Sequence, residues 1–266
     1  MIRRCYHMTQ LKKNGFTLIE LMVGMAMASI IMIAIASTYT VQVRAKNAQE
    51  ILTDMNQTAR AALEVMTHEI RLAGLDPLGT AGARIITADV GELTFSIDRR
   101  SVAGTAALHT PNGDCCDPNE QIRYYLTNDD AGGGGDGVNN NIAGGVECHL
   151  GRETGSGLIA ALGCGGGTNG LQPLGRHVDA LNFVYLDDTG NVLGPVPLDA
   201  NQRNNIRIIE VTIVARAGAE SRGFLYEYTD TNAYENLQGD VILPAQNDNF
   251  RRLQLSTAIV CRNIGL

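Results

Sequence analysis

Residues 12–43 read KKNGFTLIELMVGMAMASIIMIAIASTYTVQV, and this stretch decides the fold. Two lysines come first, and a glycine then leads into a long apolar run. From Phe16 to Val43 there are 28 residues, and only Glu20 among them carries an acidic or basic side chain. A helix of this length can cross a bilayer core of roughly 30 Å. We therefore expect a hydrophobic helix over residues 16–43 that lies in a membrane or in an equally apolar bundle of helices.

Beyond Arg44 the apolar run gives way to an amphipathic pattern. Apolar residues now recur every three or four positions, which marks one face of a helix: Ile51, Met55, Ala59, Leu63, Met66, Ile70 and Ala73. Gly74 is suited to end the helix, and Pro77 cannot continue it. Residues 44–76 are thus expected to be the amphipathic half of the same helix, with one stripe packed against a globular head.

Residues 77–266 have the pattern of a β-rich head. Six runs show the period-two or β-branched composition of strands, at residues 83–90, 92–98, 121–126, 178–186, 205–216 and 252–262. Between residues 127 and 175 lie 16 of the 30 glycines, so this section is expected to form a long loop insertion with one short strand near 158–162. The predicted fold class is α+β, with a long N-terminal helix packed on an antiparallel β-sheet head.

The N-terminus differs from an ordinary secretory signal, in which the cleavage site follows the apolar region. Here the cleavable glycine, Gly15, precedes that region, so removal of residues 1–15 would leave the hydrophobic helix on the mature chain. Glu20 is a second anomaly, because a carboxylate inside an apolar membrane helix costs roughly 2.5–3.5 kcal/mol. Cleavage after Gly15 would create an α-amine on Phe16, one helical turn from Glu20, and that amine could compensate the carboxylate in the same chain or in a neighbour.

These residues resemble a known processing signal. The segment Asn14-Gly15-Phe16-Thr17-Leu18-Ile19-Glu20-Leu21 is similar to the type IV prepilin motif. The resemblance implies that a prepilin peptidase cuts after Gly15 and methylates the new amine of Phe16, and that Glu20 sets the register between subunits. It also implies the type IV pilin fold and a single-pass position in the bacterial inner membrane with the head in the periplasm. After assembly the chain would lie in a pilus on the cell surface.

Three further segments, residues 69–77, 178–185 and 252–263, are similar to PilW-type minor pilins, which are related to the J-type pseudopilin of type II secretion. This resemblance implies a structural subunit that takes part in initiation and assembly of the pilus, in a tip priming complex. Its partners would be other minor pilins and the major pilin, reached through the N-terminal helix. Two alternatives stay open: a pseudopilin of a type II secretion system, and a pilus-tip adhesin or calcium-binding module.

Composition argues against two classes of function. Without residues 1–15 the chain has 17 basic and 28 acidic side chains, a formal net charge of −11, and Lys46 is its single lysine. Such an acidic chain is not expected to bind the phosphate backbone of a nucleic acid. The sequence has no Gly-Lys pair, no nucleophile-elbow spacing and no Cys-x-x-Cys-His motif. We therefore expect neither an enzyme nor a bound organic cofactor.

Five cysteines remain once the leader and its own cysteine are removed: Cys115, Cys116, Cys148, Cys164 and Cys261. An exported protein can keep disulfides. Adjacent cysteines have Cα atoms about 3.8 Å apart, too close for an ordinary bridge between them. Cys148 with Cys164 would close a loop of about 15 residues, worth about 3 kcal/mol. Either Cys115 or Cys116 with Cys261 is a second candidate, and a zinc site formed by the first four cysteines with His149 is a third.

Residues 131–139 approach the nonapeptide of calcium-binding toxin repeats, with Ala131 in place of its first glycine. Those repeats bind calcium by stacking, and one copy is present here, although an oxygen-rich loop can also bind calcium singly. Asp129, Asp130 and Asp136 are therefore candidate calcium ligands. The alternative is a flexible polar loop without a metal.

Overall fold

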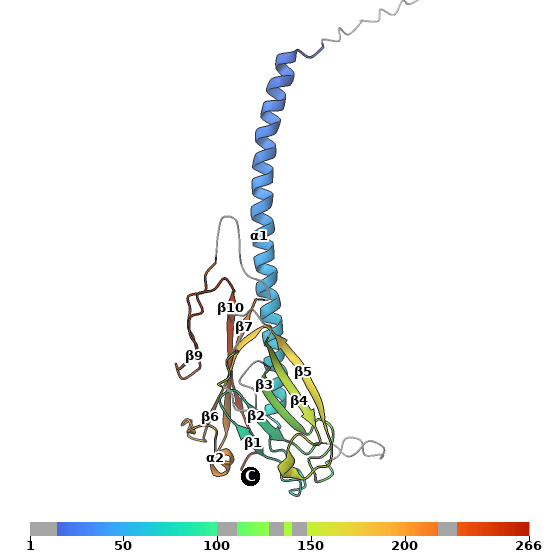
Figure 1. Ribbon diagram of the computed structural model, residues 1–266, viewed down its shortest axis with the longest axis vertical. Helices are drawn as coiled ribbons and strands as arrows, with labels where there is room; N and C mark the ends of the chain where they lie inside the picture. The colour runs from blue at the N-terminus through green and yellow to red at the C-terminus, as the bar shows by residue number, and fades with distance from the viewer. Residues whose placement is uncertain (1–14, 100–110, 128–135, 140–147, 218–227, 266) are drawn as a thin grey trace, which may run out of the picture. The chain divides into compact units, whose positions relative to one another are not determined.

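The computed structural model describes residues 15–99, 111–127, 136–139, 148–217 and 228–265 (Figure 1). The chain forms two compact units, residues 1–49 and residues 50–266. Helix α1, Leu18–Ile70, contributes its first part to the first unit and its last part to the second. The long helix expected from the sequence is therefore present, although its regular part begins after Phe16 and ends before Gly74.

The last turn of α1 ends by a change in hydrogen bonding. The N–H groups of Leu72 and Ala73 donate to the carbonyl oxygens of Glu69 and Ile70, three residues back, as in a 3₁₀ turn. Gly74 then takes φ +76°, a left-handed conformation that glycine adopts readily. Its N–H donates to the carbonyl oxygen of Ser96 at 3.0 Å, and this bond ties the end of the helix to the sheet.

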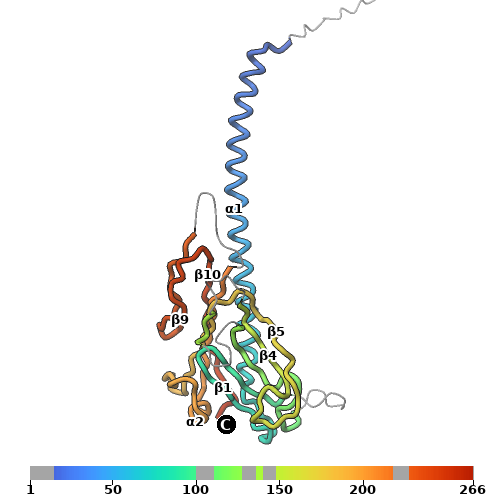
Figure 2. The backbone as a smooth tube through the Cα atoms, in the orientation of Figure 1, coloured from blue at the N-terminus to red at the C-terminus, as the bar shows by residue number. Residues whose placement is uncertain are grey.

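Antiparallel sheets build the head, and Figure 2 traces the path of the backbone through it. The larger sheet has the order β1-β2-β3-β4-β5, with strands Ile85–Ala88, Leu93–Ser96, Gln121–Leu126, His149–Gly155 and Thr168–Arg176. A three-stranded sheet has the order β10-β7-β6, with β6 at Val178–Leu186, β7 at Ile208–Arg216 and β10 at Arg252–Val260. Strands β8, Tyr234–Glu235, and β9, Val241–Leu243, form a small third sheet. Two short helices, η1 at Ala160–Leu162 and α2 at Ala200–Asn204, complete the described elements.

The main core of the second unit joins the last part of α1 to the two larger sheets. Met66 and Ile70 of α1 are fully buried and belong to one apolar cluster with Phe95 of β2 and Ile213 of β7. The buried positions of the helix follow the predicted stripe with two changes. Ile51 is only half-buried, and Ala62 is buried where Leu63 was expected. The buried residues of the helix are Met55, Ala59, Ala62, Met66 and Ile70. A smaller cluster on the opposite face of the three-stranded sheet contains Ala180, Val214, Tyr234 and Leu243.

The six predicted strand regions coincide with β1, β2, β3, β6, β7 and β10. The prediction of a long loop insertion over residues 127–175 is wrong where that section is described, because β4 and β5 lie there and pair with each other. Glycine favours this pairing locally: a Cβ at Gly155 would collide with the backbone of Gly167. The strand predicted near residues 158–162 is instead the 3₁₀ helix η1, which ends at Gly163 with φ +69°.

Candidate functional site

The start of α1 is fixed by reciprocal hydrogen bonds between Thr17 and Glu20. The backbone N–H and the hydroxyl of Thr17 both donate to Glu20 Oε2 at 2.9 Å, and the N–H of Glu20 donates to Thr17 Oγ1 at 3.3 Å. This arrangement is a capping box, in which a threonine before the first helical residue and a glutamate three positions later satisfy each other's backbone donors. Glu20 therefore caps its own helix in the uncleaved chain, a contact that the Thr-x-x-Glu spacing could have predicted.

Gly15 and Phe16 lie immediately before this capping box, in non-helical backbone. The side chain of Phe16 is 91% exposed, and no described atom lies within 4 Å of a Cβ placed on Gly15. A protease could therefore reach the predicted cleavage bond without unwinding the helix. Residues 1–14, which hold the rest of the predicted leader, lie outside the described residues.

The apolar part of α1 is exposed along its whole length within the first unit. Every residue from 16 to 43 is exposed, including Leu18, Ile31 and Tyr39. Among the described residues, α1 is the one helix whose length and composition would allow it to cross a membrane. Apolar surface of this extent is unfavourable in water. The segment therefore needs a bilayer or other apolar helices around it.

Glu69 connects α1 to the five-stranded sheet within the second unit. Arg152 of β4 donates from Nη2 and Nε to the two carboxylate oxygens of Glu69 at 2.6 and 2.8 Å. Tyr124 of β3 donates its hydroxyl to the same carboxylate, and burial, with the charge of Glu69, raises the pKa of Tyr124 well above its usual value. The phenol thus stays a donor, and a bidentate ion pair adds to the apolar packing between sheet and helix.

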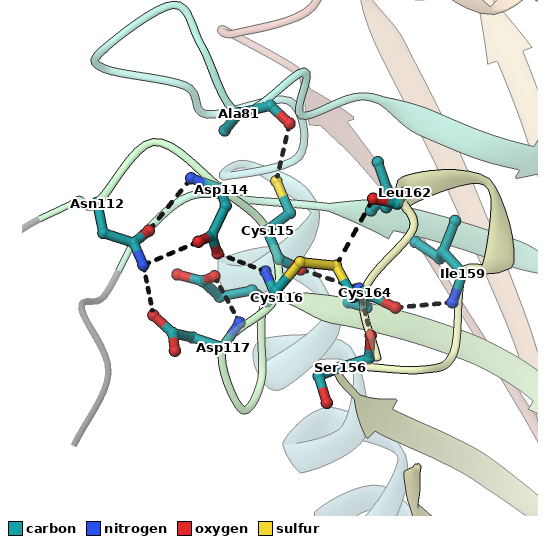
Figure 3. The surroundings of a disulfide bond; sticks show 12 residues. Ala81, Asn112, Asp114, Cys115, Cys116, Asp117, Ser156, Ile159, Leu162 and Cys164 are labelled. Atoms are coloured by element: carbon teal, nitrogen blue, oxygen red, sulfur yellow. Dashed lines mark hydrogen bonds between the residues drawn. A yellow bond between two sulfur atoms is a disulfide. The ribbon is translucent and has the colours of Figure 1, made fainter. Parts of the chain in front are cut away.

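The disulfide in the structure joins Cys116 to Cys164, with Cα atoms 5.3 Å apart (Figure 3). The predicted pairing of Cys148 with Cys164 is therefore wrong. Cys148 precedes β4 and Cys164 follows its far end, so a seven-residue strand of about 23 Å separates them. Cys148 instead lies in the core, where Thr127 Oγ1 donates to its sulfur at 3.8 Å.

The alternative pairing of Cys115 or Cys116 with Cys261 is also wrong. Cys116 is already bonded, and Cys115 and Cys261 are buried thiols that contact the carbonyl oxygens of Ala81 and Ile70. Burial raises the pKa of both thiols to about 12, so neither forms a reactive thiolate near neutral pH. The disulfide uses Cys116 and Cys164, so two of the ligands of the predicted zinc site cannot bind a metal.

A group of carboxylates lies beside the disulfide. One oxygen each of Asp114, Asp117 and Glu120 lies within 4.8 Å of the others. The carboxylates already accept hydrogen bonds from the turn around them, among them those from the N–H of Cys116 to Asp114 at 2.8 Å and from the N–H of Asp117 to Glu120 at 3.1 Å. The carboxylates therefore have a structural role, because they hold the loop that carries Cys116.

Two of the candidate calcium ligands, Asp129 and Asp130, lie outside the described residues. The third, Asp136, accepts a hydrogen bond from the N–H of Val138 at 2.9 Å and so closes a turn. The calcium site stays a prediction.

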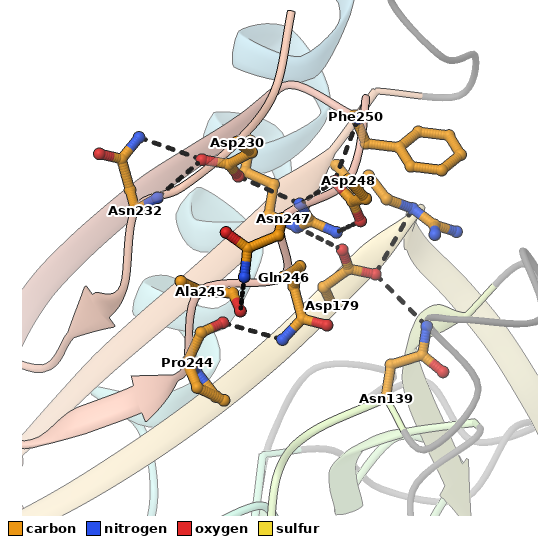
Figure 4. Close-up of polar contacts among 12 residues, drawn as sticks. Asn139, Asp179, Asp230, Asn232, Pro244, Ala245, Gln246, Asn247, Asp248 and Phe250 are labelled. Atoms are coloured by element: carbon orange, nitrogen blue, oxygen red, sulfur yellow. Dashed lines mark hydrogen bonds and ion pairs between the residues drawn. The ribbon is translucent and has the colours of Figure 1, made fainter.

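A buried ionic cluster fixes the start of the C-terminal strand, and the sequence reading missed it. Arg252 of β10 donates to Asp179 Oδ2 at 2.8 Å and to Asp230 Oδ2 at 3.1 Å, and its Nη2 lies 2.6 Å from Asp248 Oδ2 (Figure 4). The side chains of Arg252, Asp179 and Asp230 are fully buried. Arg216 lies 3.5 Å from Asp179 and stacks over the ring of Phe250. Asp179, the single charged residue in the predicted strand region 178–186, was the available signal.

Comparisons with known proteins agree with the geometry of the N-terminus. Residues 10–36 match the family model of the prokaryotic N-terminal methylation motif, a segment that includes Gly15, Phe16 and Glu20. Among solved structures, a type IV-like pilin from Thermus thermophilus has a TM-score of 0.45 and 14% identity, over 79% of this chain and 98% of that chain. A search of the curated proteins gives no match.

Proposed function

Because this chain is a type IV pilin-like protein, we propose that it is a minor subunit of a type IV pilus that helps to initiate the filament in a tip priming complex. The observation that carries this proposal is the first part of α1, which is apolar, exposed and interrupted by a single carboxylate, that of Glu20. The predicted cleavage bond between Gly15 and Phe16 lies just before it and is accessible. A helix that served only as a membrane anchor would gain nothing from a carboxylate at Glu20. A helix that later joins a bundle can use this carboxylate to pair with the terminal amine of a neighbour.

Processing prepares the helix for that bundle. A prepilin peptidase cuts between Gly15 and Phe16 and methylates the amine of Phe16, which retains its positive charge. Glu20 Oε2 is already aimed at the start of the helix through the N–H and hydroxyl of Thr17. The new amine therefore arises next to an oriented carboxylate, and the opposite charges favour each other in an apolar environment.

Assembly then exchanges lipid for protein around α1. The chain waits in the inner membrane with its head in the periplasm, and its helix leaves the bilayer as it joins other minor pilins and the major pilin. Apolar helix surface gains little from this exchange by itself, because lipid is equally apolar. The pairing of Glu20 with a neighbouring Phe16 amine supplies the specific attraction and sets the axial register of the subunits.

Replacing Glu20 by alanine at the native locus tests the proposal. Surface filaments should become scarce, while the chain is still cleaved at Gly15 and accumulates in the membrane. Asp54→Ala is the matched control, because it removes an exposed carboxylate from the same helix and should leave the filament number unchanged. Normal filament number in the Glu20→Ala strain would refute the role in pilus assembly. If secreted proteins accumulated in the periplasm of that strain instead, the chain would be a pseudopilin.

A further inference from the structure

The four outer edges of the two larger sheets are protected to different degrees. β1 is short, and its Ala88 carbonyl accepts a hydrogen bond from the N–H of Leu198. β5 contains Pro173 and two register shifts, features that hinder strand addition. β6 is covered where Leu181 N–H donates to the carbonyl of Gly137. β10 has nine residues without proline, glycine or lysine, so its edge has none of these protections.

The hydrogen-bond register shows which groups of β10 face outward. The N–H of Cys261 donates to Arg207, and the N–H of Ala217 donates to Arg251. Because bonded and non-bonded pairs alternate in an antiparallel ladder, the odd-numbered residues of β10 bond to β7. The N–H and carbonyl groups of the even-numbered residues point away from β7, and within the described residues no backbone bond reaches them: Gln254, Ser256, Ala258 and Val260.

A groove runs beside this edge, between β10 and the last part of α1. Leu255 and Thr257 of β10 line one wall, and Leu63 and Thr67 of α1 line the other, around a volume of about 420 Å³. Leu255 lies opposite Ile213 of β7, whose side chain faces the core under α1. A strand added to β10 would therefore place every second side chain in this groove.

The rim of the groove carries two arginines and one acidic side chain. Arg60 and Glu64 of α1 line it, as does Arg71, which directly follows the helix, and all three are exposed. No described residue forms an ion pair or a side-chain hydrogen bond with either guanidinium, although the chain has an excess of acidic side chains. The two arginines are eleven positions apart, or about 16 Å at 1.5 Å per residue. Four residue steps of an extended strand cover about 13 Å, so two side chains that far apart on one face come within reach of the long arginine side chains.

We propose that the outer edge of β10 is a docking site for an extended segment of another polypeptide, in which two acidic side chains flank an apolar one on the same face. The added strand would bond to the outward N–H and carbonyl groups of the even-numbered residues. Its central apolar side chain would contact Leu63 and Thr67, and its acidic side chains, four residues apart, would reach Arg60 and Arg71. This mode of recognition takes affinity from main-chain bonds and specificity from alternate side chains. It does not depend on the chain being part of a pilus.

A labelled nine-residue peptide with Asp-Thr-Val-Thr-Asp at its centre is the probe, and the cleaved full chain in detergent micelles is the target. Binding is measured by fluorescence anisotropy. We expect a peptide with lysine in place of both aspartates to bind at least about tenfold more weakly, because like charges oppose each other at the rim. The combined variant Arg60→Glu and Arg71→Glu should reverse that preference. Both substitutions lie at exposed positions, so they should not perturb the fold.

Ala258→Pro tests the main-chain contacts. Proline removes an outward N–H and its ring blocks strand addition, while the ladder to β7 does not use that group. We expect at least about tenfold weaker peptide binding and an unchanged melting temperature, and Ala258→Ser, which keeps the N–H, should bind normally. Equal binding by the two peptides, or full binding by Ala258→Pro, would overturn the proposal.

Amide hydrogen exchange gives a second readout that does not depend on any variant. In the cleaved chain alone, the amides of Leu255, Thr257 and Ile259 should be protected, whereas those of the even-numbered residues between them should exchange rapidly. Addition of the aspartate peptide should protect the even-numbered amides. Slow exchange at these amides before any peptide is added would contradict the proposal, because the edge would already be occupied. Filament formation and cleavage at Gly15 are scored separately, so either hypothesis can fail alone.

Discussion

Replacing Arg252 by methionine is expected to destabilise the head strongly. Methionine fills a similar volume but leaves Asp179 and Asp230 as buried carboxylates without their main cation. Removal of one partner of a buried ion pair costs about 3–5 kcal/mol, because the remaining charge stays in a low-dielectric site. At about 2–4 °C for each kcal/mol in a unit of this size, the melting temperature should fall by about 6–20 °C near neutral pH.

The fall in melting temperature caused by Arg252→Met should depend on pH. In the unchanged chain, burial favours the neutral form of Asp248, but hydrogen bonds from Arg252 and from the N–H of Phe250 outweigh it and lower its pKa. This contribution to stability is present above the unfolded pKa of about 3.9 and is lost as the pH falls through the folded pKa. Arg252→Met removes this contribution, so the difference in melting temperature should shrink as the pH falls below about 4.

Thermal unfolding of the cleaved chain in detergent micelles, followed by circular dichroism of the β signal, measures both effects. Arg262→Met is the matched control, because Arg262 is exposed and no described residue forms a hydrogen bond or ion pair with it. It should melt within about 1–2 °C of the unchanged chain, since surface substitutions usually cost less than 0.5 kcal/mol. Adding Asp179→Asn to Arg252→Met should recover part of the loss. Equal melting temperatures for Arg252→Met and the control would refute the assigned role of the cluster.

Three further outcomes are expected. Thr17→Val should speed amide exchange in the first turn of α1, because loss of a helix cap costs about 0.5–2 kcal/mol. Thr17→Ser keeps the hydroxyl and should not. Equal exchange rates in the two variants would contradict the capping box. Replacing Cys116 and Cys164 by serine opens a link with a sequence separation of 48 residues and should cost about 4 kcal/mol in denaturant unfolding; an unchanged midpoint would exclude that link. Gly74→Ala should destabilise more than Gly79→Ala. Both glycines have positive φ, but only at Gly74 would a Cβ lie as close as 3.0 Å to the C-terminal segment. Equal losses would rule out this packing.

The parts of the fold that local sequence determines were predictable. The apolar run from Phe16, the stripe that includes Met66 and Ile70, and the stop at Gly74 each depend on residues within a few turns of helix. The same holds for the six strand regions, whose period-two or β-branched composition can be read within each run. The processing segment was found for a related reason, since Gly15, Phe16 and Glu20 form a contiguous motif. The capping threonine lay inside that motif and could also have been found.

The rest depends on pairing between distant segments. Cys116 meets Cys164 because the antiparallel pairing of β3 with β4 places the loop after β4 beside the loop before β3, and no spacing rule contains that information. Arg252 and Asp179 are 73 residues apart and meet because β6 and β10 flank β7. High glycine content suggested loops over residues 127–175, whereas some of these glycines allow strands to approach closely. Local composition cannot distinguish these two uses of glycine.

The first residue of the protein isolated from its native host tests the central claim most directly. Mass analysis of the N-terminal peptide should find a chain that starts at Phe16 and carries one additional methyl group on its α-amine. A chain that starts at Phe16 would have a positively charged amine beside Glu20, in the first turn of an apolar helix. A chain that starts at Met1, or at any position other than residue 16, would contradict the claim that cleavage prepares this helix for assembly.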